Sequence, residues 1–286
     1  MTAPRKKRER VQSETESVAV AEVSCWKENE TPCAHNDSLA KEEPLEIRVR
    51  GRGLAVTMRT PGHDKELAAG FLFTEGVIRD RDDVSGIALC RQGEVPNPEN
   101  TLNVFLPPTI ELDLDRLTRH VFASSSCGLC GKISIESIHQ LFPPVASDMR
   151  IESQTLLMLP DRLRAAQSVF DATGGLHAAA VFNANGELIC AREDVGRHNA
   201  VDKIIGAGFL GGTLPFEAHL LLVSGRASFE IMQKALAARI PIVAAISAPS
   251  SLAVEFAKDS GQTLIGFLRD GGFRVYSHTQ RVVKPS

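Results

Sequence analysis

Short apolar runs in the second half of the chain limit what it can fold into more than any other feature of the sequence. Each run is bounded by glycine, serine or charged residues, which is typical of buried strands, and helical patterns separate several of them. The predicted strands are 178–182, 187–192, 220–224, 242–246, 263–267 and 274–277, and the predicted helices are 201–206, 228–238 and 251–257. Asn185-Gly186 predicts a hairpin turn between the first two strands. Strands that alternate with helices predict an α/β layer with a largely parallel sheet.

The first half has a different pattern. Apolar residues alternate with charged ones on both sides of Gly51-Arg52-Gly53, which predicts a β-hairpin. A helix is predicted from about 65 to 73, where Asp64 can cap it, and two further strands at 87–91 and 102–106. Two strands, a helix and two more strands indicate a small α+β roll.

The start of the chain has neither pattern. Residues 1–42 are charged, rich in Ser and Thr and without sustained periodicity, which predicts a disordered tail. The expected organisation is therefore a tail over 1–42, a small α+β domain over 43–122 and an α/β domain over 123–286.

The most informative short segment is Ser126-Cys127-Gly128-Leu129-Cys130-Gly131-Lys132, which we expect to lead into a helix. Backbone N–H groups at a helix start favour a thiolate over a thiol, and Lys132 adds to this effect. A thiolate at Cys127 or Cys130 could attack a sulfur donor. A structural zinc site normally needs four ligands, and no second CxxC occurs, although half a site could be completed across a dimer.

Polar clusters stand at the ends of the predicted strands. In an open α/β sheet, ligands bind beyond the carboxyl ends of the strands, where helix N-termini hold anions. The candidate residues in these clusters are His177, Arg197, His198, Ser224, Arg226 and Ser247. Other interpretations remain open: Asp194 could pair with Arg197, and the serines could serve only as helix caps.

Composition excludes several classes of partner. The net charge is −3 and the chain has one Trp and one Tyr, so neither duplex DNA nor stacked single strands are expected as ligands. No stretch is apolar for the length that a membrane span needs, so we expect a cytoplasmic protein. Six cysteines in 286 residues are too few for a disulfide framework.

The motifs together resemble the FdhD/NarQ family of formate dehydrogenase accessory sulfurtransferases, in order over roughly residues 43–280. The resemblance rests on long segments, which begin with Arg59-Thr60-Pro61-Gly62-His63-Asp64 and the Ser-Cys-Gly-Leu-Cys-Gly loop. The others are Thr173-Gly174-Gly175-Leu176-His177, Glu193-Asp194-Val195-Gly196-Arg197-His198-Asn199, Ser224-Gly225-Arg226-Ala227-Ser228 and Ser247-Ala248-Pro249-Ser250-Ser251.

The resemblance implies a small N-terminal α+β roll followed by a cytidine-deaminase-like three-layer α/β domain, in a homodimer. It implies that sulfur passes from a cysteine desulfurase through a persulfide on Cys127, assisted by Cys130. The acceptor would be the bis-molybdopterin guanine dinucleotide molybdenum cofactor, bound as a substrate and destined for formate dehydrogenase. No permanently bound metal is expected. The family's cofactor-binding segment corresponds to Phe267, Leu268, Arg269, Asp270, Gly271 and Gly272. A non-enzymatic cofactor-binding chaperone is the alternative.

Overall fold

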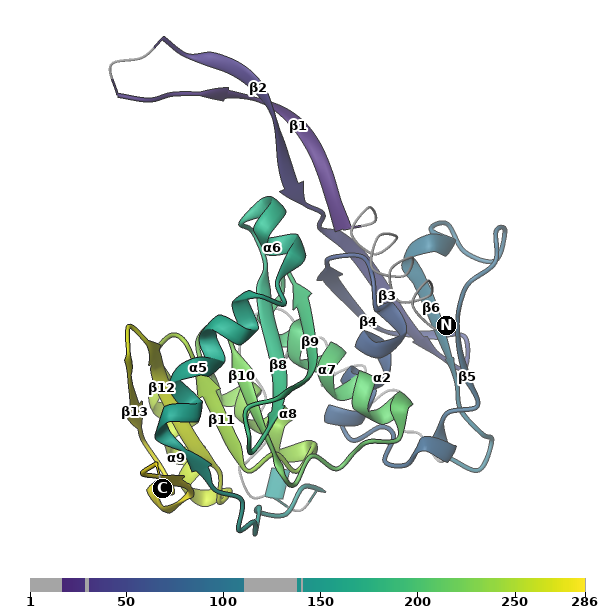
Figure 1. The fold of residues 1–286 in the computed structure, drawn as a ribbon. Coiled ribbons are helices and arrows are strands. Elements are labelled where there is room, and N and C mark those ends of the chain that lie inside the picture. The colour runs from purple at the N-terminus through teal and green to yellow at the C-terminus, as the bar shows by residue number, and fades with distance from the viewer. Residues whose placement is uncertain (1–16, 29–30, 111–137, 140, 286) are drawn as a thin grey trace, which may run out of the picture.

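Two sheets form the body of the molecule (Figure 1). The structure is a computed structural model, and it describes residues 17–28, 31–110, 138–139 and 141–285. The boundary expected between 122 and 123 lies outside this range. The smaller sheet has the order β4-β3-β6-β5 and the larger one β13-β12-β11-β10-β8-β9.

The elements of the small layer are β3 (Glu43–Val49), β4 (Arg52–Arg59), α2 (Asp64–Thr74), β5 (Gly86–Leu89) and β6 (Thr101–Phe105). This confirms the predicted hairpin, helix and two further strands. The expected cap on the helix is wrong. His63 holds the N-cap position in a left-handed conformation, while the Asp64 carboxylate accepts two hydrogen bonds of 3.0 Å from the Arg59 guanidinium. Arg59 is buried, and the pairing with Asp64 compensates its desolvation.

The large layer contains β8 (His177–Asn183), β9 (Leu188–Asp194), β10 (His219–Val223), β11 (Ile242–Ala245), β12 (Thr263–Arg269) and β13 (Gly272–Val275). Its helices are α5 (Ser153–Arg164), α6 (Ser168–Thr173), α7 (Arg197–Gly211), α8 (Phe229–Ala237) and α9 (Ser251–Asp259), and β7 (Ile151–Glu152) pairs with β14 (Val282–Val283) at its margin. The α/β class is confirmed. The sequence patterns did not predict α5 and α6.

The prediction of a largely parallel sheet is wrong. Only β10–β11 and β11–β12 are parallel, while β8–β9, β8–β10 and β12–β13 are antiparallel. Tight turns after β8 and β12 cause two of these pairings, because a connection of a few residues can join only antiparallel neighbours. The helix α7 links β9 to β10, which run in the same direction, and β8 lies between them in the opposite direction.

Helices cover both faces of the large sheet, which explains why its strands are apolar on both sides. On one face Val181, Val223 and Val243 pack against α7, α8 and α9. On the other face Phe182 and Leu222 pack against α5. The small layer has its own core, formed by β3, β4, β6 and α2, and Phe209 of α7 reaches into it.

The two layers meet where α2 crosses α7 at a pair of glycines. A Cβ atom on Gly70 would lie 1.8 Å from the backbone oxygen of Asp202, and one on Gly206 would lie 1.8 Å from the backbone oxygen of Glu66. The helix backbones are therefore in direct contact, and only glycine fits at either position. This crossing holds β9 and the start of α7 against the segment that precedes α2.

The disordered tail predicted over 1–42 is wrong for its second half. β1 (Val18–Cys25) and β2 (Cys33–Ala40) pair in an unbroken antiparallel register and form a two-stranded ribbon that projects from the body (Figure 1). Ser17 anchors its base, since its hydroxyl donates to the Pro61 carbonyl oxygen at 2.8 Å. No residue of either strand is buried, so the ribbon lacks the core-facing apolar residues by which sequence analysis recognises a strand. Residues 1–16 lie outside the described part of the chain.

No helix in the described residues is both long and apolar enough to cross a bilayer.

Candidate functional site

The polar clusters that the sequence places at strand ends meet on one side of the six-stranded sheet, beyond the carboxyl ends of most of its strands. β9, β10, β11 and β12 end there and β8 begins there, while α7, α8 and α9 start beside these ends. We call this the strand edge. The first N–H groups of a helix have no partner within the helix, so three helix starts at one edge favour an anionic ligand. At α9 one of these groups is already satisfied, because the Ser250 hydroxyl accepts from the Ala253 N–H at 3.2 Å.

Backbone hydrogen bonds join the loops of the strand edge into one surface. The Ser224 N–H donates to the Ala178 carbonyl oxygen at 2.9 Å, and the Ser224 hydroxyl accepts from the Ala178 N–H at 2.9 Å. Further along, the Ser250 N–H donates to Ala227 and the Phe267 N–H to Ser247, each at 3.0 Å. The Ser224 hydroxyl therefore has a structural partner, whereas Ser247 contributes its carbonyl oxygen to the framework.

Gly225 brings the first part of the edge together. A Cβ atom at this position would lie 3.3 Å from Nδ1 of His177 and 3.8 Å from Cβ of Arg197. Burial lowers the pKa of His177, and the charges of Arg197 and Arg226 lower it further against the opposing effect of Asp194. The imidazole is therefore neutral at neutral pH and leaves the two arginines as the cations of this region.

Arg197 is the side chain that most suggests a ligand. Its Nε atom is buried and has no hydrogen-bond partner among the described residues. An unsatisfied buried donor on a charged group is costly, and a bound phosphate or carboxylate oxygen would satisfy it. The pairing of Arg197 with Asp194, considered above, does not occur, because Asp194 lies 2.7 Å from Lys203 Nζ.

His198 lies between Ser228 and Glu230, which belong to the start of α8. Its Nε2 is 3.2 Å from the Ser228 hydroxyl and its Nδ1 is 3.2 Å from the Glu230 carboxylate. Burial lowers the pKa of His198 to about 3, with contributions from Arg197 and Lys234. The ring is thus neutral at neutral pH. Because a carboxylate only accepts, the ring proton belongs on Nδ1, and Nε2 then accepts from Ser228.

Phe267 begins the last predicted segment of the site, where β12 turns into β13. Phe267 has a positive φ of 53° at a bulge, and the Arg274 guanidinium lies 4.5 Å from the centre of its ring. Asp270 and Gly271 both have positive φ, at 53° and 71°, as the two central residues of a type I′ turn require. Arg269 and Gly272 pair across this turn. The turn alone therefore explains why Asp270 and Gly271 stand at these positions, without any ligand.

Leu268 differs from its neighbours. It is fully buried in the core cluster on the α5 face of the sheet, so its side chain faces away from solvent. The exposed side chains in this segment are those of Arg269 and Asp270, which lie 3.6 Å apart. Any ligand at the segment would meet the Phe267 ring, Arg269 and backbone atoms.

A buried polar network centred on Asp194 holds the strand edge in place. The Asp194 carboxylate accepts hydrogen bonds from the backbone N–H groups of Thr60 and Gly196 and from the Asn199 amide, and it pairs with Lys203. The Lys203 ammonium also donates to the Thr60 carbonyl oxygen at 2.9 Å. These contacts hold the loop that carries Arg197 against the first domain. Sequence analysis gave Asp194 no such partner, because Thr60 and Lys203 converge only in the folded chain.

Two cavities lie on either side of the loop Pro61-Gly62-His63. One, of about 470 Å³, extends toward α6 and Lys203, and the other, of about 680 Å³, extends toward Arg59 and Asn100. Beside them His63 lies 3.2 Å from Glu66, which also pairs with Arg192, and these contacts outweigh burial to lower the pKa of Glu66 to about 2. Neither cavity is lined by the residues predicted for the site.

The residues predicted to carry sulfur, Cys127 and Cys130, lie outside the described residues, as does Lys132. The structure therefore gathers His177, Arg197, His198, Ser224, Arg226, Ser247 and the 267–272 segment along one edge and leaves the cysteine loop to the sequence. Ser228 and Glu230 are the members that sequence analysis did not assign. Their signal was the Ser-x-Glu spacing at a helix start, which helix capping explains equally well.

Known proteins with a similar sequence identify the family of this chain. A model of the FdhD/NarQ family matches residues 40–283. The chain belongs to the FdhD/NarQ family. A relative named sulfur carrier protein FdhD, from Streptomyces avermitilis, is 52% identical over 251 residues, which is 86% of this chain and 89% of the relative. A protein with the same name from Sulfolobus acidocaldarius is 45% identical over 246 residues, covering 86% of this chain and 91% of its own length.

A solved structure supports the membership. The crystal structure of "a putative formate dehydrogenase accessory protein" from Desulfotalea psychrophila is 25% identical, with a TM-score of 0.75. It aligns over 93% of this chain and 100% of its own. The family match begins at residue 40, so the ribbon formed by β1 and β2 precedes it.

Proposed function

We propose that this FdhD/NarQ family member is a sulfurtransferase in which Cys127 carries sulfur as a persulfide. A cysteine desulfurase is the donor, and the acceptor is the bis-molybdopterin guanine dinucleotide cofactor, which formate dehydrogenase then needs for activity. The proposal rests on the membership of the chain in a family whose relatives are named sulfur carriers. It includes a homodimer in the cytoplasm.

The strand edge supports the second part of the proposal. The proposed cofactor carries phosphates and guanine nucleotides, so its site needs cations and free backbone N–H groups. Arg197 and Arg226 supply the charge, and the starts of α7, α8 and α9 supply the N–H groups. Neutral His177 and His198 add no charge but can donate or accept hydrogen bonds. The unsatisfied Nε of Arg197 is the observation that most favours an anion here.

The proposed chemistry has two steps. The Cys127 thiolate attacks the outer sulfur of the donor persulfide, the bond between the two donor sulfurs breaks, and the donor leaves as a thiolate. In the second step the Cys130 thiolate attacks the inner sulfur at Cys127. This forms a Cys127–Cys130 disulfide and releases the outer sulfur as hydrosulfide to the acceptor.

Intact-mass measurement tests the first step. The protein is incubated with a cysteine desulfurase and cysteine, and we expect an adduct of one sulfur atom that a reductant removes. Cys127→Ala should abolish the adduct, and Cys130→Ala should retain it but slow delivery. Cys33→Ala, which removes an exposed thiol elsewhere, is the matched control and should load normally.

The outcome separates this proposal from the chaperone alternative. A chaperone would bind guanosine diphosphate at the strand edge but form no adduct. An adduct that persists in Cys127→Ala would refute the carrier role of Cys127. Sedimentation of the unmodified protein tests the proposed homodimer.

A further inference from the structure

The projecting ribbon carries two cysteines that face each other. In the register of β1 and β2, Cys25 is the direct partner of Cys33, and this is the last pair of the ladder. Residues directly opposite in an antiparallel pair have their side chains on the same face. The two thiols therefore lie on one side of the ribbon, at the end farther from its anchor at Ser17.

The geometry of this pair is within reach of a disulfide. The Lys41 N–H donates to the Ser17 carbonyl oxygen, so 17 and 41 form a hydrogen-bonded pair. Hydrogen-bonded and non-hydrogen-bonded pairs alternate, which makes Cys25 and Cys33 a hydrogen-bonded pair with Cα atoms about 5.5 Å apart. Disulfides span Cα distances of roughly 4.4 to 6.8 Å, but the Cβ atoms must approach by about 1 Å. The last pair of a ladder can make this adjustment, at the cost of some strain.

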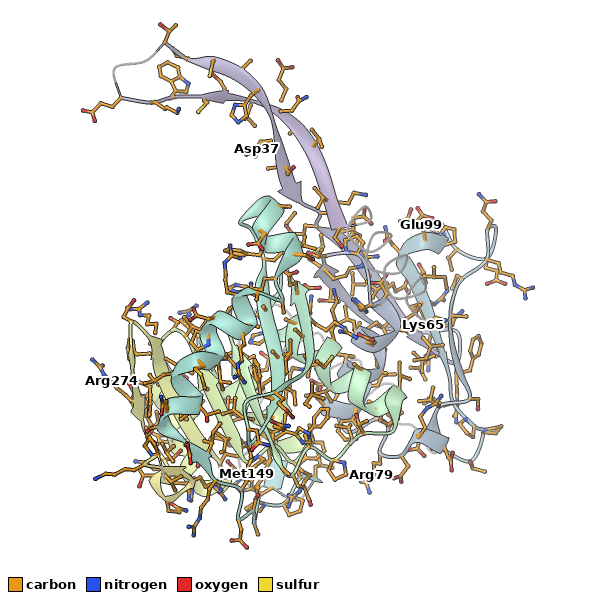
Figure 2. The ribbon with its side chains drawn as sticks, in the orientation of Figure 1. Asp37, Lys65, Arg79, Glu99, Met149 and Arg274 are labelled. Carbon is orange, nitrogen blue, oxygen red and sulfur yellow. The ribbon has the colours of Figure 1, made fainter. Side chains whose placement is uncertain are left out.

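The surroundings leave both thiols accessible. Cys33 is exposed and Cys25 is partly exposed, and the far end of the ribbon projects away from the body (Figure 2). The other two described cysteines differ. Cys90 is buried and accepts a hydrogen bond from the Asn103 amide, and burial raises the pKa of Cys190. Among the described cysteines, only those of the ribbon combine a facing partner with access to solvent.

We propose that Cys25 and Cys33 form a redox-active dithiol site that reacts with low-molecular-weight disulfides such as oxidised glutathione. One cysteine thiolate attacks the small disulfide, forms a mixed disulfide and releases one small thiolate. The second cysteine thiolate then displaces the remaining small thiol, so that a Cys25–Cys33 disulfide forms and one oxidised glutathione becomes two reduced ones. Strain in the hydrogen-bonded position makes this bond easily reversed. The site does not depend on the proposed sulfur transfer at Cys127.

Peptide mapping of the full chain tests the proposal. After treatment with oxidised glutathione and alkylation of the remaining thiols, trypsin cleaves after Lys27 and separates the two cysteines into peptides 11–27 and 28–41. We expect these peptides to be linked to each other, and the link to disappear on reduction. Cys127 and Cys130 stay together in peptide 120–132, so oxidation of the loop is read separately from the same digest.

A register-shifted variant provides the control. In Cys33→Ser/Ala34→Cys the thiol moves by one residue to the opposite face of the ribbon, where Ala34 pairs with Ser24. The link to Cys25 should then form about tenfold more slowly, because the Cβ atoms point apart. Equal rates in both proteins would mean that the register does not bring the thiols together. That result, fully alkylated Cys25 and Cys33 after oxidation, or a link only between chains on non-reducing electrophoresis would overturn the proposal.

Discussion

The interface between the two layers and the strand edge both contain buried charged groups, but these groups are paired differently in the two regions. At the interface each buried cation meets an acid: Lys203 Nζ lies 2.7 Å from Asp194, and Lys234 Nζ lies 2.9 Å from Asp202. Burial would lower the pKa of Lys234, but the carboxylates of Asp202, Glu75 and Glu230 more than reverse this effect and raise it. At the strand edge Arg197 keeps a buried Nε without a partner in the described chain.

The difference separates residues that stabilise the fold from residues for which we propose a ligand. A buried ion pair with further hydrogen bonds is complete, and its loss destabilises the protein. A buried donor without a partner costs free energy that a bound anion would recover. Residues at the end of β9 and directly after it take part in both regions, since Asp194 belongs to the interface and Arg197 to the strand edge.

The largest effect should follow from breaking the interface pair. Lys203→Met leaves the Asp194 carboxylate buried and unpaired, so we expect the free energy of unfolding to fall by about 3–5 kcal/mol. Urea denaturation measures this loss. The double variant Lys203→Met/Asp194→Asn removes the isolated charge and should recover part of the stability. Equal losses in the single and double variants would show that the charge is not the cause.

The helix crossing gives the next effect. Gly206→Ala places a Cβ atom against the Glu66 carbonyl oxygen of α2, so the helices must separate and stability should fall by about 2–3 kcal/mol. Gly211→Ala is the same substitution in the same helix, with no atom within 4 Å of the added Cβ. It should stabilise by up to about 1 kcal/mol through helix propensity. Similar results for both variants would contradict close packing at the crossing.

These two regions also differ in how well sequence predicts them. The strand-edge residues could be placed because each lies at one end of an apolar run, and strand ends of an α/β sheet gather on one side of the sheet. The interface could not, since Thr60 and Asp194 are far apart in sequence and nothing in either segment specifies the other. The contact of the two helices at Gly70 and Gly206 could not be predicted either, because a glycine within a helical pattern can have several structural causes.

For the fold as well, local features could be predicted from the sequence and long-range features could not. Local patterns predicted the strands of the two large sheets and most helices, and Asn185-Gly186 predicted the turn of one hairpin. Strand direction across the sheet depends on the path of the whole chain, so the antiparallel pairing of β8 with β10 was missed. The ribbon was missed because no residue of either strand is buried, and the alternation in β1 is short and is not repeated in β2. The helix α5 contains Pro160, which weakened its helical pattern, although it packs firmly on the sheet.

The strand edge should respond in binding rather than stability. Arg197→Gln removes the buried Nε that has no partner in the described chain, so it should leave the free energy of unfolding unchanged or raise it by up to about 1 kcal/mol. It should weaken the binding of guanosine diphosphate about tenfold, because it removes a charge-assisted contact. Isothermal titration calorimetry measures the affinity. Arg79→Gln removes a cation far from Arg274 and the strand edge (Figure 2) and should bind normally. Equal affinity in the two variants would remove Arg197 from the proposed site.

The smallest effect concerns protons at the strand edge. Burial lowers the pKa of His198 to about 3, whereas an unfolded histidine titrates near 6.5. Between these values the unfolded chain binds more protons than the folded one, so stability falls as the pH decreases below about 6.5. His198→Gln removes this titration and keeps a polar group near Ser228. The variant should lose about 1 kcal/mol less stability than the unmodified protein between pH 6.5 and about pH 5.5, measured by urea denaturation. Parallel pH profiles would mean that His198 titrates in the folded protein as it does in the unfolded chain, which would contradict a neutral ring between Ser228 and Glu230 at these pH values.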